Sequence, residues 1–210
     1  MTLDEQLATF NIIETERLLL RPFLMTDAPD MFAYASRPEN LVYVFPAHQT
    51  LAETRTAIAT LFMKAPLGKW AIEHKADGRM IGTIGFGKRD DKKRAVEIGY
   101  VLNQMYWGQG LMTEAVRTLA EMSLTTFGLY QVDIVVDVDN IGSQQVAEKS
   151  GFRLQESYKA LNPYTKVLRK FKRYRKTLNG HRSFMTPLGR SVSVGQVSRD
   201  DKVISQKGKR

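Results

Sequence analysis

The sequence predicts a single domain of mixed α/β class, and three observations lead to this prediction. Several short runs alternate apolar and polar residues, which is typical of half-buried strands. Other stretches repeat apolar residues every three or four positions, which is typical of amphipathic helices. Between one such strand and the longest such helix lie two glycines, Gly108 and Gly110. A hydrophobic content of 43% over 210 residues is enough for one core.

In the first half of the chain, local signals mark where strands and helices stop and start. The first strand ends at Pro22, and the helix after it begins with a capping Thr26 or Asp27 and a proline in its first turn. Asp77-Gly78 is a typical hairpin turn. Strands are therefore expected over residues 17–21, 70–73, 80–86 and 95–102, helices near 26–36 and 50–63, and a charged turn at 88–94.

In the second half, the glycine pair opens a helix in which Leu111, Ala115 and Leu119 share one face, and Gly128 is a natural end for it. A strand is expected over residues 130–138, a helix over 143–149, and a hairpin over 153–177 with its turn near Asn162-Pro163. Beyond Leu178 the apolar periodicity fades. The expected organisation is an N-terminal extension at 1–10, a folded domain at 11–178 and a basic flexible tail at 179–210.

The stretch from Tyr106 to Ala115 is the best candidate for a binding site. Glycines let backbone amides approach a ligand closely, and the start of a helix favours negative charge. Together these features suit a pyrophosphate group. The competing interpretation is an ordinary glycine-rich turn, which an isolated Gly-x-Gly favours.

The net charge of +9 is concentrated toward the end of the chain. Residues 179–210 carry seven basic and two acidic side chains, which gives +5, and Lys166 to Lys176 contain seven basic residues and no acid. For the second group, one explanation is an edge strand guarded by lysines. The other is a surface for a polyanion such as a nucleotide cofactor, RNA or an acidic peptide.

Several classes of protein find no support in the sequence. Without cysteine there is no disulfide framework and no cysteine-based metal site. His48, His74 and His181 are scattered without ligand spacing, so no metal is expected. Neither a signal peptide nor a membrane-spanning apolar run is visible, and a cytoplasmic location is expected.

A series of short segments gives the chain a resemblance to a known family. The segments are Thr15-Glu16-Arg17-Leu18-Leu19-Leu20-Arg21, Gly82-Thr83-Ile84-Gly85, Glu97-Ile98-Gly99-Tyr100, Tyr106-Trp107-Gly108-Gln109-Gly110 with Thr113-Glu114-Ala115, and Asn140-Ile141-Gly142-Ser143 followed by Glu148-Lys149-Ser150-Gly151-Phe152. In this order and spacing, the chain from about Glu14 to Leu178 resembles the GCN5-related N-acetyltransferase (GNAT) superfamily. Within it, the chain is most similar to the branch typified by the ribosomal-protein N-terminal acetyltransferases.

The resemblance implies a mixed, mostly antiparallel sheet of about seven strands, splayed in the middle and flanked by about four helices. Acetyl-CoA would lie in the splay, between the strand ending near Leu102 and the strand that follows the glycine helix. The residues implied in its binding are Gly108, Gln109, Gly110, Leu111 and Met112 for the pyrophosphate, the backbone of Val101, Leu102 and Asn103 for the pantetheine arm, and the Asn140 side chain for the same arm. Relatives usually carry Gln or Arg three residues before the first glycine, where this chain has Met105.

The implied chemistry is direct attack of a neutral amine on the thioester, which needs a group that takes the amine proton. Glu97, in an otherwise apolar strand, is the candidate base; the alternatives are a surface glutamate paired with a neighbouring basic residue, and a water relay. A backbone amide near Leu102 is the expected donor to the oxyanion. Ser143 is the candidate acid for the thiolate, because the tyrosine of many relatives is Ala147 here. A plain helix cap is the alternative role of Ser143.

The expected function is therefore acetyl-CoA-dependent N-acetylation of a protein or peptide N-terminal α-amine. Two alternatives stay open: a small-molecule amine acceptor such as an antibiotic or a polyamine, and a non-catalytic protein that binds CoA or ribosomes. A homodimer is open because dimers are common among relatives. A membrane is not an expected partner, and neither is nucleic acid, although contact through the basic tail stays open.

Overall fold

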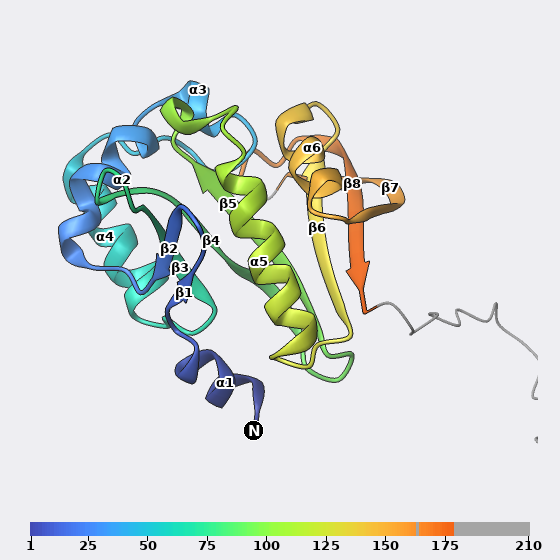
Figure 1. Cartoon of the computed structure of the whole chain (residues 1–210). Coiled ribbons are helices and arrows are strands. Elements are labelled where there is room, and N and C mark those ends of the chain that lie inside the picture. Colours follow the sequence, from blue (N-terminus) through green and yellow to red (C-terminus); the bar gives the residue numbers. More distant parts are fainter. Residues whose placement is uncertain (163, 179–210) are drawn as a thin grey trace, which may run out of the picture.

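The computed structural model describes residues 1–162 and 164–178, which form one eight-stranded sheet with helices on both faces (Figure 1). The strand order is β1-β2-β3-β4-β5-β6-β8-β7. The strands are β1 Ile13–Glu14, β2 Leu18–Arg21, β3 Lys69–His74, β4 Arg79–Asp90, β5 Ala95–Leu102, β6 Gln131–Asp137, β7 Arg153–Leu161 and β8 Leu168–Thr177. The predicted class, a mixed and mostly antiparallel sheet, is confirmed. The predicted tail, residues 179–210, lies outside the described residues.

The helices are α1 Leu3–Thr9, α2 Ala28–Ala35, α3 Pro38–Leu41, α4 Leu51–Ala57, α5 Leu111–Thr125 and α6 Ile141–Lys149. A π-helical turn, Ile58–Met63, continues α4. The elements beyond the predicted counts are the two-residue strand β1 and the short helices α1 and α3. In the expected N-terminal extension, Thr2 caps α1 together with Glu5, and Leu7 is buried in the main core.

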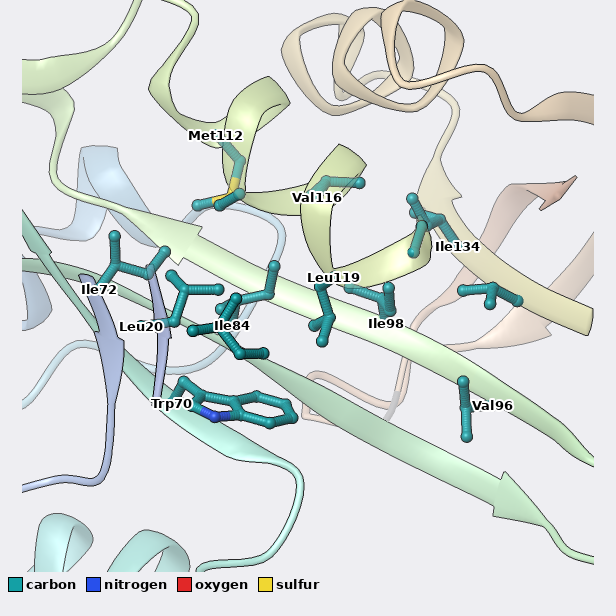
Figure 2. Packing of buried hydrophobic residues seen from close by; sticks show 14 of the residues in the cluster. Leu20, Trp70, Ile72, Ile84, Val96, Ile98, Met112, Val116, Leu119 and Ile134 are labelled. Atoms are coloured by element: carbon teal, nitrogen blue, oxygen red, sulfur yellow. The ribbon is translucent and has the colours of Figure 1, made fainter. Parts of the chain in front are cut away.

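The two faces of the sheet carry separate cores. Trp70 and Ile72 of β3 belong to the large cluster under α5, whereas Ala71 between them belongs to the cluster under α2 and the turn after α4. This alternation places the two clusters on opposite faces of the sheet. Figure 2 shows Met112, Val116 and Leu119 of α5 pointing toward the sheet. The helical spacing in the sequence therefore identified the buried face of α5.

The sheet separates between β5 and β6, as the family resemblance implied. These are the only neighbouring strands of the described sheet that run parallel, and they pair over just three positions, Ala95–Glu97 with Gln131–Asp133. Beyond Glu97 the two strands diverge, and α5 crosses the sheet in front of this gap (Figure 1). Backbone groups at the ends of both strands are therefore left without a neighbouring strand.

Two expectations about charged segments are wrong. The expected turn over residues 88–94 is partly strand, because Lys88 to Asp90 continue β4 and pair with β5. The basic stretch from Lys166 is not an edge strand, since β8 lies between β6 and β7. Its arginines pair with acids of neighbouring segments: Arg175 with Asp133, Arg169 with Asp137 and Asp139, and Arg173 with Glu156. These ion pairs leave less free positive charge than the sequence suggests.

Candidate active site

A cavity of about 640 Å³ opens where β5 and β6 separate. Its lining comes from the ends of β5 and β6, the loop before α5, the first turns of α5 and α6, and the segment from α3 to Val44. Of the predicted site residues, Val101, Leu102, Gly108, Gly110, Leu111, Met112, Asn140 and Ser143 line the cavity, whereas Glu97, Asn103 and Gln109 do not. One continuous space therefore runs from the glycine loop, residues 107–110, to α3.

The glycine loop presents an uncovered helix start to this cavity. Gly108 and Gly110 have φ angles of 76° and 77°, in the left-handed region, and Gly110 is the N-cap of α5. An added Cβ at Gly108 would meet nothing within 4 Å, so lack of space does not require glycine there. The left-handed backbone conformation does. Within the described chain, the amides of Leu111, Met112 and Thr113 donate to no acceptor. Free amides at a helix start are what a phosphate group binds.

A partly buried acid, Glu114, and an arginine hold the glycine loop in place. Glu114 accepts hydrogen bonds from the Thr15 hydroxyl at 2.6 Å, the Arg17 amide at 2.8 Å and the Arg17 side chain at 2.7 Å. Arg17 Nη1 also donates to the carbonyl of Gln109 at 2.9 Å. Burial acts to raise the pKa of Glu114, but these hydrogen bonds lower it below its usual value. The segments Thr15–Arg21 and Thr113–Ala115, which carry part of the family resemblance, therefore contact each other in the structure.

Asn40 of α3 clamps the corner between β5 and the glycine loop. Its Nδ2 donates to the carbonyl of Leu102 at 3.1 Å, and its Oδ1 accepts from the amide of Gln104 at 2.6 Å. The indole of Trp107 donates to the same Leu102 carbonyl at 2.9 Å. Both lone pairs of that carbonyl are therefore engaged. Asn40 is buried, and no feature of the sequence had singled it out.

The ladder between β4 and β5 decides which backbone groups face the splay. The amide of Asn103 donates to the carbonyl of Ile81 at 2.8 Å. Because hydrogen-bonded pairs alternate along an antiparallel ladder, Val101 also bonds to β4, while Tyr100 and Leu102 point the other way. This geometry favours the Tyr100 backbone and the Leu102 amide as partners of a pantetheine arm. It corrects the expectation for Val101 and Asn103, whose amides face β4.

Glu97 lies at the last paired position of β5, opposite Asp133 of β6. Its neighbours Val96 and Ile98 belong to the core under α5, so the Glu97 side chain lies on the opposite face. Burial raises its pKa; the charges of Lys88 and Arg173 offset part of this shift, and that of Asp133 adds to it. Within the described chain Glu97 forms no ion pair. A carboxyl with a raised pKa suits a base, although Glu97 does not reach the cavity lining.

Asn140 and Ser143 lie at the start of α6, on the other side of the splay. The Asn140 side chain accepts from the amide of Ser143 at 3.1 Å and is the cap of α6. The alternative role of Ser143 as a helix cap is therefore wrong. Instead, Ser143 Oγ lies 2.7 Å from the hydroxyl of Tyr100 on β5. Tyr100 belongs to Glu97-Ile98-Gly99-Tyr100, one of the segments that carry the family resemblance, but the sequence did not indicate its contact with Ser143.

The comparisons with known proteins define the family. The description "Acetyltransferase (GNAT) domain" matches residues 17–153. The uncharacterized N-acetyltransferase YoaA of Bacillus subtilis is 32% identical over 149 residues, which cover 69% of this chain and 84% of YoaA. The ribosomal-protein-serine acetyltransferase of Escherichia coli is 28% identical over 102 residues, covering 44% of this chain and 57% of that protein. The chain therefore belongs to the GNAT acetyltransferase family.

The fold comparison agrees with this membership. A GNAT-family acetyltransferase from Bacillus anthracis superposes with a TM-score of 0.72 and 24% identity, covering 79% of this chain and 98% of that structure. The chain is accordingly an N-acetyltransferase, and acetyl-CoA is its cosubstrate. In the part of the chain that the structure describes, no helix is long and apolar enough to cross a membrane. The same residues contain no cluster of three or more acidic or histidine side chains that would hold a metal.

Proposed function

We propose that this protein transfers the acetyl group of acetyl-CoA to the N-terminal α-amine of a protein or peptide. The observation that carries the proposal is the cavity at the splay, which joins the glycine loop to the open side beside α3. The pyrophosphate would bind the amides from Gly108 to Met112, including those of Gln109, Gly110 and Leu111. The pantetheine arm would then lie along Leu102 and contact Asn140, and the thioester would reach the space between β5 and α6.

The charge of the cavity lining supports an acceptor with a single ammonium group. The lining carries the carboxylates of Glu39, Asp137 and Asp139, and one ammonium group, that of Lys149 on α6. Arg169 pairs with both aspartates, at 2.9 and 3.0 Å, whereas Glu39 has no ion-pair partner in the described chain. One uncompensated carboxylate matches one ammonium better than it matches a polyamine or an aminoglycoside. The name of the Escherichia coli relative, which refers to a ribosomal-protein serine, supports the same acceptor class.

In this proposal the amine loses its proton to Glu97 through water, because Glu97 does not line the cavity, and attacks the thioester carbonyl. The amide of Leu102 donates to the oxyanion, and Ser143 protonates the departing thiolate. The cytoplasmic location and a homodimer stay predictions.

The test is release of CoA thiol from acetyl-CoA in the presence of different amines. Short peptides with a free N-terminus are compared with the same peptides acetylated at that position, with polyamines and with aminoglycosides. We expect turnover with the free peptides and none with the blocked ones. Turnover confined to polyamines or aminoglycosides would transfer the assignment to a small-molecule acetyltransferase. Binding of acetyl-CoA without turnover of the free peptides would overturn the proposed acceptor class.

A further inference from the structure

We propose that Tyr100 and Ser143 form a two-proton relay in which Tyr100 supplies the proton that Ser143 passes to the departing CoA thiolate. The inference rests on the proposed function, because it concerns the second half of the same acetyl transfer. Two hydroxyl groups carry it. The Tyr100 Oη and the Ser143 Oγ are 2.7 Å apart, and both residues line the cavity at the splay.

The position of this contact favours a role in the reaction. Backbone pairing between β5 and β6 ends at Glu97, three residues before Tyr100. Tyr100 reaches across the resulting gap from β5 to the first turn of α6, where Ser143 lies. The thioester of a cofactor bound in the splay has to lie in this same gap. The hydroxyl pair is therefore beside the atoms whose bonds change.

The chemistry explains why two hydroxyl groups serve better than one. A thiol has a pKa of about 8.5 and a phenol one of about 10, whereas an aliphatic hydroxyl is a much weaker acid than either. Ser143 alone would become an alkoxide after giving up its proton. A phenol that donates to the serine oxygen replaces that proton in the same step. Tyr100 of β5 supplies such a phenol from across the splay.

Every proton that moves in the step has a donor and an acceptor. The carbon–nitrogen bond forms first, and the amine proton passes to Glu97 or to water. When the tetrahedral intermediate collapses, the carbon–sulfur bond breaks, and the sulfur takes the proton of Ser143 Oγ. Ser143 takes the phenolic proton of Tyr100 in turn, and the phenolate regains a proton from water after CoA has left. No oxidant, metal or covalent enzyme intermediate takes part.

The environment of Tyr100 keeps the phenol in its donor form. Burial raises the pKa of Tyr100, and the hydrogen bond with Ser143 lowers it only in part. The phenol is therefore protonated throughout the neutral and mildly alkaline range. Its oxygen is also 3.2 Å from the carbonyl of Ser143, which gives the phenolic proton a second acceptor while no thiolate is present.

The test compares Tyr100→Phe, Ser143→Ala and the double variant with wild type, using the amine acceptor found for the wild-type enzyme. We expect each single variant to lower kcat by roughly 10²-fold, the lower end of the usual range for general acid catalysis. The KM for acetyl-CoA should change less than about twofold. The double variant should be no slower than the slower single variant, since both remove the same proton path. The solvent deuterium isotope effect on kcat should fall in both single variants.

Tyr174→Phe is the matched control. Tyr174 of β8 donates to Glu148 of α6 at 3.0 Å, so it is also a phenol that ties a strand to α6, but it lies outside the cavity lining. This variant should keep kcat. A raised KM with unchanged kcat in Tyr100→Phe, or losses that multiply in the double variant, would overturn the relay and leave the proposed function intact. Absence of acetyl transfer by wild type to every amine would overturn both.

Discussion

At the scale of single residues, Glu97 lies in the expected strand but outside the cavity lining. Its carboxyl lies one position before the splay and on the face opposite α5, so a water molecule has to connect it to an amine in the cavity. Its raised pKa nevertheless sets it apart from ordinary surface glutamates. Both observations are compatible with a base that acts through one water.

Replacing Glu97 with glutamine tests this role. Glu97→Gln should lower turnover by roughly 10²-fold, the usual size of a general-base contribution. The loss should shrink above a pH of about 8, because an α-amine is then largely neutral without help. Acetyl-CoA affinity should not change. Glu156→Gln, on the edge strand β7, removes an exposed glutamate as a control. Full turnover of Glu97→Gln at neutral pH would assign Glu97 a structural role.

The direction of the Glu97 pKa shift also predicts an effect on stability. A carboxyl whose folded-state pKa is raised binds more protons when folded, so its contribution to folding becomes less favourable as the pH rises from its unfolded to its folded pKa. At neutral pH the buried charge is a net cost. Glu97→Gln removes that charge, so its melting temperature at pH 7 should equal or exceed that of wild type. A clear drop, measured by calorimetry, would show that the carboxylate is stabilised by its neighbours.

The sequence singled out Ser143 and Leu102 as candidates, but not Tyr100 and Asn40, which contact them. Tyr100 and Asn40 act through partners that are 43 and 62 to 64 positions away in the chain. A contact of that kind depends on strand order and on the course of α3, which local patterns do not contain. Val101 and Asn103 were implied by the family resemblance, whereas the ladder with β4 decides which amides are free.

At the scale of elements, the strand–glycine–helix unit of β5, the glycine loop and α5 was the most predictable part. Local chemistry determines it: the left-handed conformation requires Gly108 and Gly110, and helical spacing requires the buried face of α5. The bonds that fix the loop in space come from elsewhere, through Arg17 and Glu114. The segments were visible in the sequence, and their pairing was not.

Replacing Gly110 with alanine tests the glycine loop. A non-glycine residue at this φ costs about 1–2 kcal/mol, and a loop that relaxes to avoid the strain would lose about tenfold in acetyl-CoA affinity. Gly78→Ala is the matched control, because Gly78 has a φ of 62° and lies outside the cavity lining. An added Cβ would meet nothing within 4 Å at Gly78 and only Arg17 Nη2, at an ordinary contact distance of 3.7 Å, at Gly110. Both variants should lose similar stability in thermal unfolding. Only Gly110→Ala should weaken binding in calorimetry; equal affinity in both would show that the loop is not the pyrophosphate site.

At the scale of the whole molecule, the class of fold followed from the sequence, while the arrangement of charge did not. The basic stretch from Lys166 looks like a free surface when it is read alone. Its arginines are paired because β8 inserts between β6 and β7, next to Asp133 and Asp137. The residue pattern within a strand does not show which strands become its neighbours in the sheet, so this insertion could not be predicted from the stretch itself. The polyanion interpretation of this stretch therefore loses much of its basis.

The positions of the two hydrophobic clusters in the chain predict the effect of removing the residues after Leu178. Both hydrophobic clusters lie between Leu7 and Tyr174, and β8 ends at Thr177, so the described core is complete without residues 179–210. A chain that ends at Leu178 should keep its melting temperature and its acetyl-CoA affinity. The control is a chain that ends at Asn162, which also lacks β8 and with it the buried Tyr174 and the central partner of β6 and β7. That control should not fold. If the chain ending at Leu178 lost most of its stability as well, the tail would be part of the core or of an interface between subunits.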